Sequence, residues 1–207
     1  MPSKAVDFLE LRVDAFAGDS ATLQALEKGA AKLKAPLLVT VRHPKEGGAN
    51  ALSATRRREL YRRFLPMASL IDVELRSAEV LKDVLMEARM QGTGVVLSYH
   101  DFRSIPPLEK LRALAEQASE IGGDVFKVAA MARNEKAVST LLEFLTNRPR
   151  RGPQYAVMGM GAFGKISRLT LGKCGSVLNY GYLDQVQVPG QWPAELLKAR
   201  LAELQEK

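Results

Sequence analysis

The residue whose type and position most clearly suggest chemistry is a lysine inside an apolar run. Lys127 lies in the segment GDVFKVAA, residues 123–130. Burying an ammonium group is costly, because desolvation disfavours the charged form and lowers the pKa of the amine. An amine that is partly neutral can attack a ketone and form a Schiff base. An edge strand whose lysine points to water is the commoner origin of such a pattern, so this run alone leaves both interpretations open.

A histidine and an arginine follow other apolar runs. His100 comes after Val95–Leu97 in the segment SYHDF, residues 98–102, and its ordinary pKa near ~6.5 suits proton transfer at neutral pH. Arg42 ends another apolar run and leads into the turn HPKEGG, residues 43–48, whose glycines allow a close approach of the backbone. Each of these residues has a structural explanation by itself, but together they favour a functional site.

Short apolar runs alternate with longer helical patterns and must position these residues. Strands are predicted over residues 8–13, 36–42, 70–75, 94–99, 125–130, 155–158 and 176–182. Helices are predicted over residues 21–33, 53–65, 78–90, 108–121, 135–145, 163–171 and 193–205. This regular alternation favours an α/β protein with a parallel sheet, either doubly wound or closed as a (β/α)8 barrel of the TIM type.

Charged residues on one face of the strands help to choose between these architectures. In residues 8–13, Glu10 and Arg12 share the face opposite the apolar side chains, and residues 72–76 repeat this alternation. Charge on one strand face, with helices packed on the other, favours a barrel with a polar mouth, where ligands bind at the C-terminal strand ends. We therefore expect one barrel domain over residues 1–207.

Composition indicates a soluble globular protein. The chain has 207 residues, 46% hydrophobic and 26% charged, which is ordinary for such a protein. It contains no apolar run of membrane-spanning length and no signal-peptide pattern, so we expect a cytoplasmic protein without a membrane partner. The single cysteine, Cys174, has no second cysteine for a disulfide and no CxxC pattern for a metal.

The net charge of +7 suits an anionic partner. The basic residues are scattered, however, and local clusters such as Arg56–Arg58 and Arg148–Arg151 are typical of solvated faces. No RNP, KH, zinc-finger or helix-turn-helix pattern accompanies the charge, so we expect no nucleic-acid partner.

Several segments resemble the type I 3-dehydroquinate dehydratases of the shikimate pathway. ELRVD at residues 10–14 resembles the E-x-R-x-D strand of that family, and SYHDF at residues 98–102 resembles its catalytic histidine signature. FKVA at residues 126–129 resembles its Schiff-base lysine strand. Arg42 with EGG at residues 46–48 resembles the R-x-x-x-E-G-G turn of the family. The segment from MGM at 158–160 through GKISR at 164–168 resembles its G-x-x-S-R segment, and PGQ at 189–191 resembles its late P-G-Q turn. The matches follow the order of the family from about residue 7 to the end of the chain.

The resemblance implies a lyase, without cofactor or metal, that dehydrates 3-dehydroquinate to 3-dehydroshikimate. It implies that Lys127 forms the Schiff base, that His100 is the general base and acid, and that Glu46 orients His100. The substrate-binding residues that it implies are Glu10, Arg12 and Arg42 at the hydroxyls, Arg168 and Gln191 at the carboxylate, and Phe102, Met158 and Met160 at the ring. It also implies a homodimer in aromatic amino acid biosynthesis.

Structural explanations stand beside several of these roles. Judged from the residues, Glu10 and Arg12 could form an ion pair inside the barrel. Met158 and Met160 are residue types found more often in a core than in a site, and Arg168 would ordinarily be a solvated charge.

The sequence departs from the family pattern in two places. Gln187 stands where the family often has a small hydroxyl residue that contacts the substrate carboxylate. Only nine residues precede Glu10, where family members usually have a complete strand and helix. With seven predicted strands, we expect a (β/α)8-type barrel that lacks its first βα unit.

Two other functions remain open on the sequence. The first is another Schiff-base barrel enzyme, such as a class I aldolase acting on a sugar phosphate. The second is a non-catalytic basic module that binds an anionic ligand or RNA, if the shortened barrel is inactive.

Overall fold

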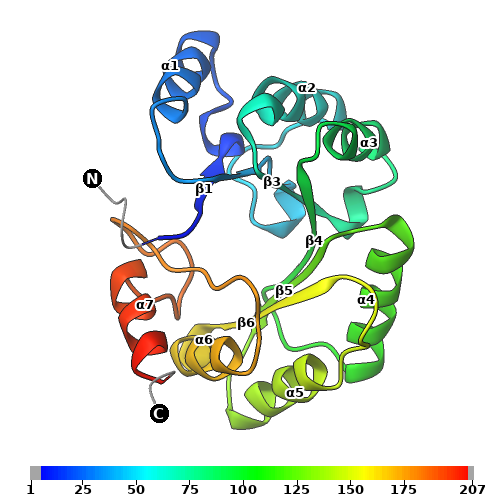
Figure 1. The fold of residues 1–207 in the computed structure, drawn as a ribbon, viewed down its shortest axis with the longest axis vertical. Helices are drawn as coiled ribbons and strands as arrows, with labels where there is room; N and C mark the ends of the chain where they lie inside the picture. The colour runs from blue at the N-terminus through cyan, green and yellow to red at the C-terminus, as the bar shows by residue number, and fades with distance from the viewer. Residues whose placement is uncertain (1–5, 205–207) are drawn as a thin grey trace. The chain divides into compact units, whose positions relative to one another are not determined.

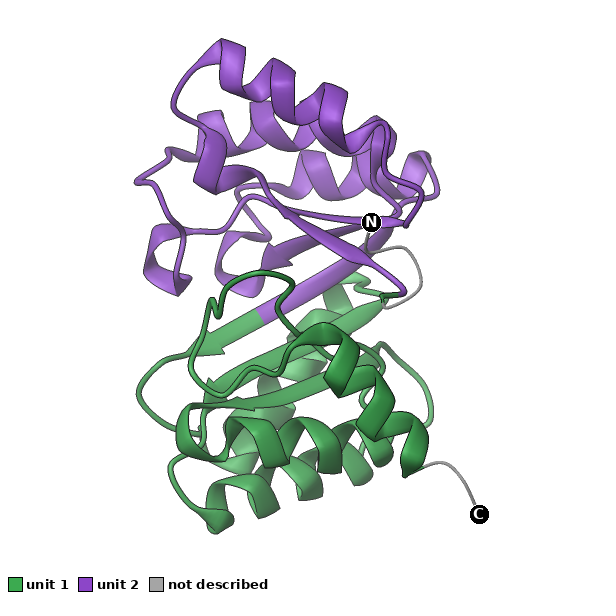
Figure 2. Ribbon diagram, turned by 90° about the vertical axis from the view of Figure 1, so that its left-hand side faces the viewer, with its two compact units in different colours: residues 1–6, 99–207 green, residues 7–98 purple. Residues whose placement is uncertain are grey.

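The computed structural model describes residues 6–204, which belong to two compact units. The N-terminal unit comprises residues 7–98, and the C-terminal unit continues from Tyr99 (Figure 2). The boundary falls inside one strand, between Ser98 and Tyr99. Among the described residues, no helix is both long and apolar enough to cross a membrane.

The N-terminal unit contains parallel strands that alternate with helices (Figure 1). Its strands are β1 (Leu9–Arg12), β2 (Leu37–Thr40), β3 (Leu70–Glu74) and the first part of β4 (Gly94–Asp101). Its α-helices are α1 (Ser20–Ala30), α2 (Ala54–Phe64) and α3 (Lys82–Met90). Short 3-10 helices follow the strands or α2: η1 (Val13–Phe16), η2 (Pro44–Glu46), η3 (Leu65–Met67) and η4 (Leu75–Ser77).

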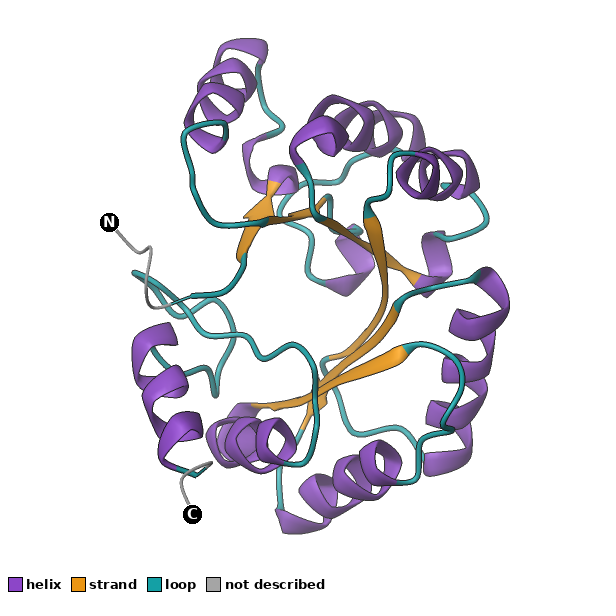
Figure 3. Cartoon of the chain, viewed as in Figure 1, coloured by secondary structure: helices purple, strands orange, loops and turns teal. Residues whose placement is uncertain are grey.

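The C-terminal unit continues β4 and repeats the same alternation (Figure 3). Its further strands are β5 (Val125–Met131) and β6 (Gln154–Met160), which pair in parallel along their whole length. Its helices are α4 (Leu108–Ile121), α5 (Glu135–Thr146), η5 (Gly161–Phe163), α6 (Gly164–Lys173) and α7 (Ala194–Glu203). In hydrogen-bonding order the strands run β1-β2-β3-β4-β5-β6, as in the sequence.

The local signals in the sequence explain where the helices begin. Ser53 caps α2, its side chain accepting a hydrogen bond from the N–H of Arg56, and Asn134 caps α5 by accepting from the N–H of Ala137. Pro193 precedes α7, where its missing N–H is no loss. The seven predicted helices and the first six predicted strands are confirmed, with ends that differ by a few residues. The α/β class with a parallel sheet is also confirmed.

An aromatic cluster packs one face of the C-terminal strands against a helix. Phe126 of β5 lies edge-on to Phe144 of α5 and to Tyr155 of β6, with ring centroids 6.2 Å and 5.9 Å away. Phe144 and Tyr155 stack at 4.9 Å. Because successive strand residues point to opposite faces, Lys127 points away from this cluster. The helix-packed face of β5 thereby determines the face on which the lysine lies.

The predicted strand over residues 176–182 is wrong. At this place the chain makes one backbone hydrogen bond toward β6, from the N–H of Val177 to the carbonyl of Tyr155 at 3.0 Å. The hydroxyl of Ser176 accepts from the N–H of Val157 at 2.8 Å and donates to its carbonyl at 3.2 Å. This one side chain therefore satisfies both backbone groups of Val157, which a further strand would otherwise pair.

Side chains also bind the rest of this segment. The amide of Asn179 donates to the carbonyl of Arg168 at 2.7 Å, and Nε of Arg168 donates to the carbonyl of Tyr180 at 3.0 Å. Only an isolated bridge between Tyr182 and Pro193 resembles strand pairing in this described segment. Residues 179 and 180 are therefore hydrogen-bonded to Arg168 of α6 and do not pair with a strand of the sheet.

Replacing Ser176 by alanine should lower the free energy of unfolding by about 1–3 kcal/mol, because it leaves the buried N–H of Val157 without its acceptor. Urea unfolding followed by circular dichroism measures this loss. Ser139→Ala is the matched control, since the exposed Ser139 hydroxyl only donates to the carbonyl of Glu135 in its own helix. Equal losses in the two variants would contradict the edge-capping role.

Candidate active site

Lys127 is buried in the C-terminal unit. Its residue exposure is 4%, and its Nζ lies 4.1 Å from the ring centroid of Tyr180, within range of a cation–π interaction. The interpretation of Lys127 as a solvent-facing edge residue is therefore wrong. His100 lies near the end of β4, the neighbour of β5 in hydrogen-bonding order, as the sequence predicts. Tyr180 is a residue that sequence reasoning missed, because it lay inside the wrongly predicted strand.

Methionines line the same strand face as the lysine. The parallel register pairs Lys127 with Ala156 and Ala129 with Met158, so these side chains share one face of β5 and β6. Met158 and Met160 are each 2% exposed. They form an apolar cluster with Ala129, against which Met131, Tyr180 and Val188 pack. The structure thus brings the amine and the two predicted ring-packing methionines together.

Arg168 is buried at 2% exposure, so its interpretation as a solvated charge is wrong. Its guanidinium donates to four backbone carbonyls, those of Tyr180 (3.0 Å), Gly159 (2.6 Å), Gly164 (3.1 Å) and Gly190 (2.8 Å). Burial lowers the pKa of Arg168 to about 10, so the group stays protonated at neutral pH. A side chain at Gly164 would approach the Cα of Gly190 to 2.8 Å, which explains the glycines on both sides of this contact.

Gln191 closes the turn that precedes α7. Its Oε1 accepts from the N–H groups of Gln187 (2.9 Å) and Val188 (3.0 Å). The amide of Gln187 donates to the carbonyl of Gln185 within the same exposed loop. Phe102 lies just after β4 and is 43% exposed. Binding of the substrate by these residues stays a prediction.

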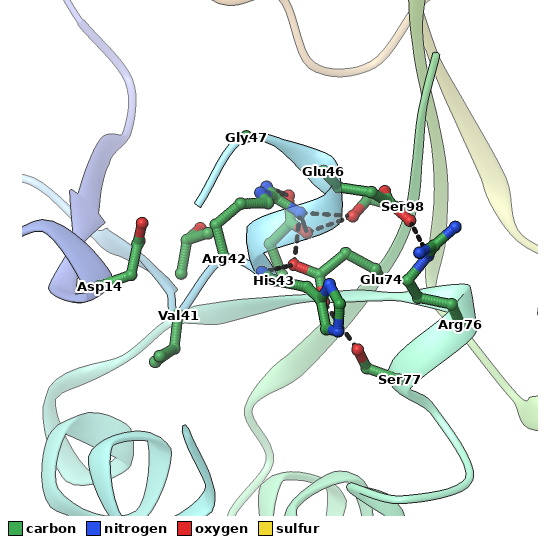
Figure 4. A network of polar contacts seen from close by, with 12 residues as sticks. Asp14, Val41, Arg42, His43, Glu46, Gly47, Glu74, Arg76, Ser77 and Ser98 are labelled. Carbon is green, nitrogen blue, oxygen red and sulfur yellow. Dashed lines mark hydrogen bonds and ion pairs between the residues drawn. The ribbon is translucent and has the colours of Figure 1, made fainter. Parts of the chain in front are cut away.

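Arg42 is at the centre of a buried polar network in the N-terminal unit (Figure 4). Its two terminal nitrogens bind both carboxylate oxygens of Asp72 at 2.9 Å, and Nη1 also binds Glu74 (3.2 Å) and Ser98 (2.8 Å). Glu10 lies 3.8 Å from Nη2. Burial by itself lowers the pKa of Arg42, but the carboxylates of Asp72, Glu74 and Glu10 outweigh it and raise the pKa well above its ordinary value.

A second arginine completes this network. Arg57 of α2 donates to Glu74 (2.5 Å), to Ser77 (2.8 Å) and to the carbonyl of Val41 (2.8 Å). Glu74 also accepts from the N–H of His43 at 2.8 Å, where the glycine-rich turn begins. Arg57 is 1% exposed, so the prediction of a solvated cluster on this helix is wrong for its central member. Helical spacing is the signal that distinguishes it, since Arg57 precedes Leu60, Tyr61 and Phe64 by three, four and seven residues and shares their buried face.

Arg12 pairs with Asp14 and Glu10 binds Thr40, so the alternative interpretation of positions 10 and 12 as an ion pair is wrong. Nε and Nη2 of Arg12 bind the two oxygens of Asp14 at 2.9 Å and 2.8 Å. Nη2 also donates to the carbonyl of Gly47. Glu10 accepts instead from the hydroxyl of Thr40 at 2.8 Å. Bidentate pairing fixes the plane of the Arg12 guanidinium beside the turn at Gly47.

The Asp14 carboxylate should stabilise the protein only above acidic pH. Burial by itself raises the pKa of Asp14, but hydrogen bonds from Arg12 and from the N–H of Ala49 outweigh it, so the pKa lies below its ordinary value. A lowered pKa gives stability that is present above ~3.9, the unfolded value, and lost as the pH falls through the folded value. Asp14→Asn should therefore cost about 1.5–3 kcal/mol of unfolding free energy at neutral pH. Urea unfolding over a pH series should show this gap closing below pH ~4, and a gap that is constant with pH would contradict the prediction.

Glu46 is the last residue of η2, and it is 3% exposed. Its Oε1 lies 2.9 Å from Nε of Arg76, a partner that the sequence did not indicate. Gly47 has a φ of 85°, and a side chain at Gly48 would collide with the carbonyl of Arg42. The turn after Arg42 therefore needs glycine at both positions, which confirms the close backbone approach that the sequence predicts.

Each unit holds part of the predicted residue set. The N-terminal unit contains Glu10, Arg12, Arg42 and Glu46, and it places Glu10 beside Arg42. The C-terminal unit contains the others and places Lys127 beside the methionine cluster. In the part of the chain that the structure describes, no three His, Cys, Asp or Glu side chains are grouped as metal ligands.

The family model and the similar proteins that match this chain name the same enzyme family. Residues 2–207 match the family model of the type I 3-dehydroquinases. The 3-dehydroquinate dehydratase of Pyrococcus abyssi is 37% identical over 209 residues, which cover 99% of this chain and 90% of that protein. The 3-dehydroquinate dehydratase of Thermodesulfovibrio yellowstonii is 32% identical over 190 residues, covering 91% of this chain and 81% of that protein.

Solved structures agree with the sequence relatives. The 3-dehydroquinate dehydratase of Geobacillus kaustophilus superimposes with a TM-score of 0.88 at 30% identity, covering 96% of this chain and 80% of that one. The type I 3-dehydroquinate dehydratase of Clostridium difficile, solved with covalently modified comenic acid, gives a TM-score of 0.86 at 30% identity. It covers 96% of this chain and 81% of that one.

Proposed function

The chain belongs to the type I 3-dehydroquinase family, and on this basis we propose that it dehydrates 3-dehydroquinate to 3-dehydroshikimate through a Schiff base on Lys127. The observation that carries the proposal is the burial of Lys127, with its amine against Tyr180 on a methionine-lined strand face. A buried amine on an apolar strand face is shielded from bulk water, which suits its condensation with a ketone to form an imine. The covalently modified comenic acid in the Clostridium difficile relative is in keeping with such chemistry.

In the proposed reaction, Lys127 supplies the nucleophile. Its neutral amine attacks the ketone carbon, one water molecule is lost and a carbon–nitrogen double bond forms. The protonated imine withdraws electrons from the adjacent carbon, so the C–H bond there becomes acidic. His100 takes this proton and leaves an enamine. The enamine expels the hydroxyl on the next carbon. His100 returns the proton to this hydroxyl, which leaves as water.

The last step restores the enzyme. A water molecule hydrolyses the imine, which frees Lys127 and releases the enone product. Two water molecules are formed and one is consumed, so the net change is the loss of one water from the substrate. The reaction needs no oxidant and no reductant.

We assign the other roles as the resemblance predicts. Glu46 orients His100, because a carboxylate that accepts from one ring nitrogen fixes the tautomer of the imidazole. Arg168 and Gln191 hold the substrate carboxylate, with Nη2 of Arg168 as the donor, since its Nε and Nη1 donate to backbone carbonyls. The substrate hydroxyls bind Glu10, Arg12 and Arg42, and the ring packs on Phe102, Met158 and Met160. We also propose that the enzyme is cytoplasmic and forms a homodimer.

The proposal is tested with 3-dehydroquinate and borohydride. Turnover is expected to appear as the ultraviolet absorbance of the conjugated product. Borohydride added during turnover should reduce the imine, and peptide mass analysis should locate the adduct on Lys127. Folded protein that gives neither product nor adduct would contradict the proposal.

A further inference from the structure

Glu46 is a buried carboxylate with an ion-pair partner from the neighbouring strand connection (Figure 4). Arg76 lies in η4, directly after β3, and its Nε is 2.9 Å from Oε1 of Glu46. The side chain of Glu46 is 3% exposed, whereas that of Arg76 is 44% exposed. The pair thus joins a solvent-accessible cation to a carboxylate that is almost closed off from water.

We propose that Arg76 is a positioning residue of the dehydratase, which holds the carboxylate of Glu46 in the orientation needed to support the catalytic histidine. This inference rests on the proposed function, in which Glu46 orients His100. Arg76 lies outside all the segments that resemble the family motifs, so the resemblance gives it no role.

The ion pairs around Glu46 favour Arg76 for this task. The buried guanidinium groups of Arg42 and Arg57 bind Asp72 and Glu74. An ionised carboxylate taken out of water is costly unless a cation or hydrogen bonds compensate it. The guanidinium nitrogen of Arg76, 2.9 Å from a carboxylate oxygen, supplies a compensating charge on one side of Glu46. Loss of Arg76 would therefore remove a charged contact that helps to fix the direction of the Glu46 oxygens.

The exposed position of Arg76 allows the proposal to be tested by chemical rescue, in which added guanidinium replaces the missing side chain. Its side chain also lines a surface cavity of about 520 Å³. The other lining residues are Arg58, Glu79, Val80, Lys82 and Asp83. Because the Arg76 side chain is 44% exposed, its truncation opens this side of Glu46 to solvent, and we expect a free guanidinium ion to reach the carboxylate.

The test compares Arg76→Ala with Arg76→Lys and with a matched control. Arg76→Ala should lower kcat about 10- to 100-fold, the range known for residues that orient metal-bound side chains in other enzymes, with KM changed less than about 2-fold. KM is spared because Glu46 acts through His100 and not on the bound substrate. Arg76→Lys should restore part of kcat, and so should guanidinium chloride added to Arg76→Ala below denaturing concentrations.

Arg58→Ala is the control. Arg58 lines the same cavity, and its Nε lies 2.7 Å from Oδ2 of Asp83, but it does not pair with Glu46. Its loss should leave kcat within about 2-fold, and guanidinium should not raise it. Urea unfolding of each variant verifies that the compared proteins are folded.

Two results would overturn the inference. One is a kcat of Arg76→Ala equal to that of Arg58→Ala, and the other is a loss that neither lysine nor guanidinium relieves. Failure of the proposed function is distinguishable, since the unmodified protein would then show no turnover and no borohydride adduct on Lys127.

Discussion

Replacing Lys127 by methionine or alanine is expected to abolish turnover of 3-dehydroquinate. Removal of a covalent nucleophile costs about 10⁴- to 10⁶-fold in kcat, because the other groups of the site have no intermediate to act on. Without the amine no imine forms, and the proton next to the ketone stays too weakly acidic for His100. Steady-state kinetics measures the loss of kcat, and mass spectrometry after borohydride measures the loss of the adduct.

The two substitutions serve different purposes. Lys127→Met keeps most of the volume of the side chain, so the packing against Tyr180 and the methionine cluster is retained. Lys127→Ala leaves space and tests whether a shorter side chain disturbs the fold. Lys110→Ala is the matched control, since the exposed Lys110 also lies over a tyrosine ring, that of Tyr99, at 5.4 Å. Turnover by Lys127→Met within about 10-fold of the unmodified protein would contradict the nucleophile assignment.

The second large effect is expected on stability. Arg42→Met should lower the free energy of unfolding by about 3–5 kcal/mol, because it leaves the buried carboxylates of Asp72 and Glu74 without the guanidinium between them. Urea unfolding followed by two spectroscopic probes measures this change. Adding Asp72→Asn to Arg42→Met should recover part of the loss, since one uncompensated charge is then removed.

Arg62→Met provides the comparison for Arg42→Met. Arg62 binds Asp83 and Glu87, but its side chain is 45% exposed. Exposed ion pairs contribute little to stability because water and salt screen them, so this control should unfold nearly as the unmodified protein does. If both variants lose the same stability, burial of the Arg42 network is not what makes it important.

Local patterns in the sequence were enough to predict most elements. Helix caps such as Ser53 and Asn134 and the run around Lys127 depend on neighbours within a few residues, and the structure has helices and strands at these places. The prediction of a strand over residues 176–182 was wrong for a physical reason. Its apolar residues are typical of a strand, but Ser176 and Arg168 satisfy the backbone groups that a strand would pair. The (β/α)8 barrel and its missing first unit stay predictions.

The order of the amino acids is sufficient to predict the alternation of strands and helices, the succession of family motifs and the lysine on which the proposed chemistry depends. The partners of the charged residues, by contrast, are known only from the folded chain. Arg42 pairs with Asp72, Arg57 with Glu74, and Glu46 with Arg76. The two residues of each pair lie in separate segments of the chain, and their pairing depends on sheet register and burial. Local periodicity does not predict these pairings, because it reports the face on which a residue lies and not what lies opposite.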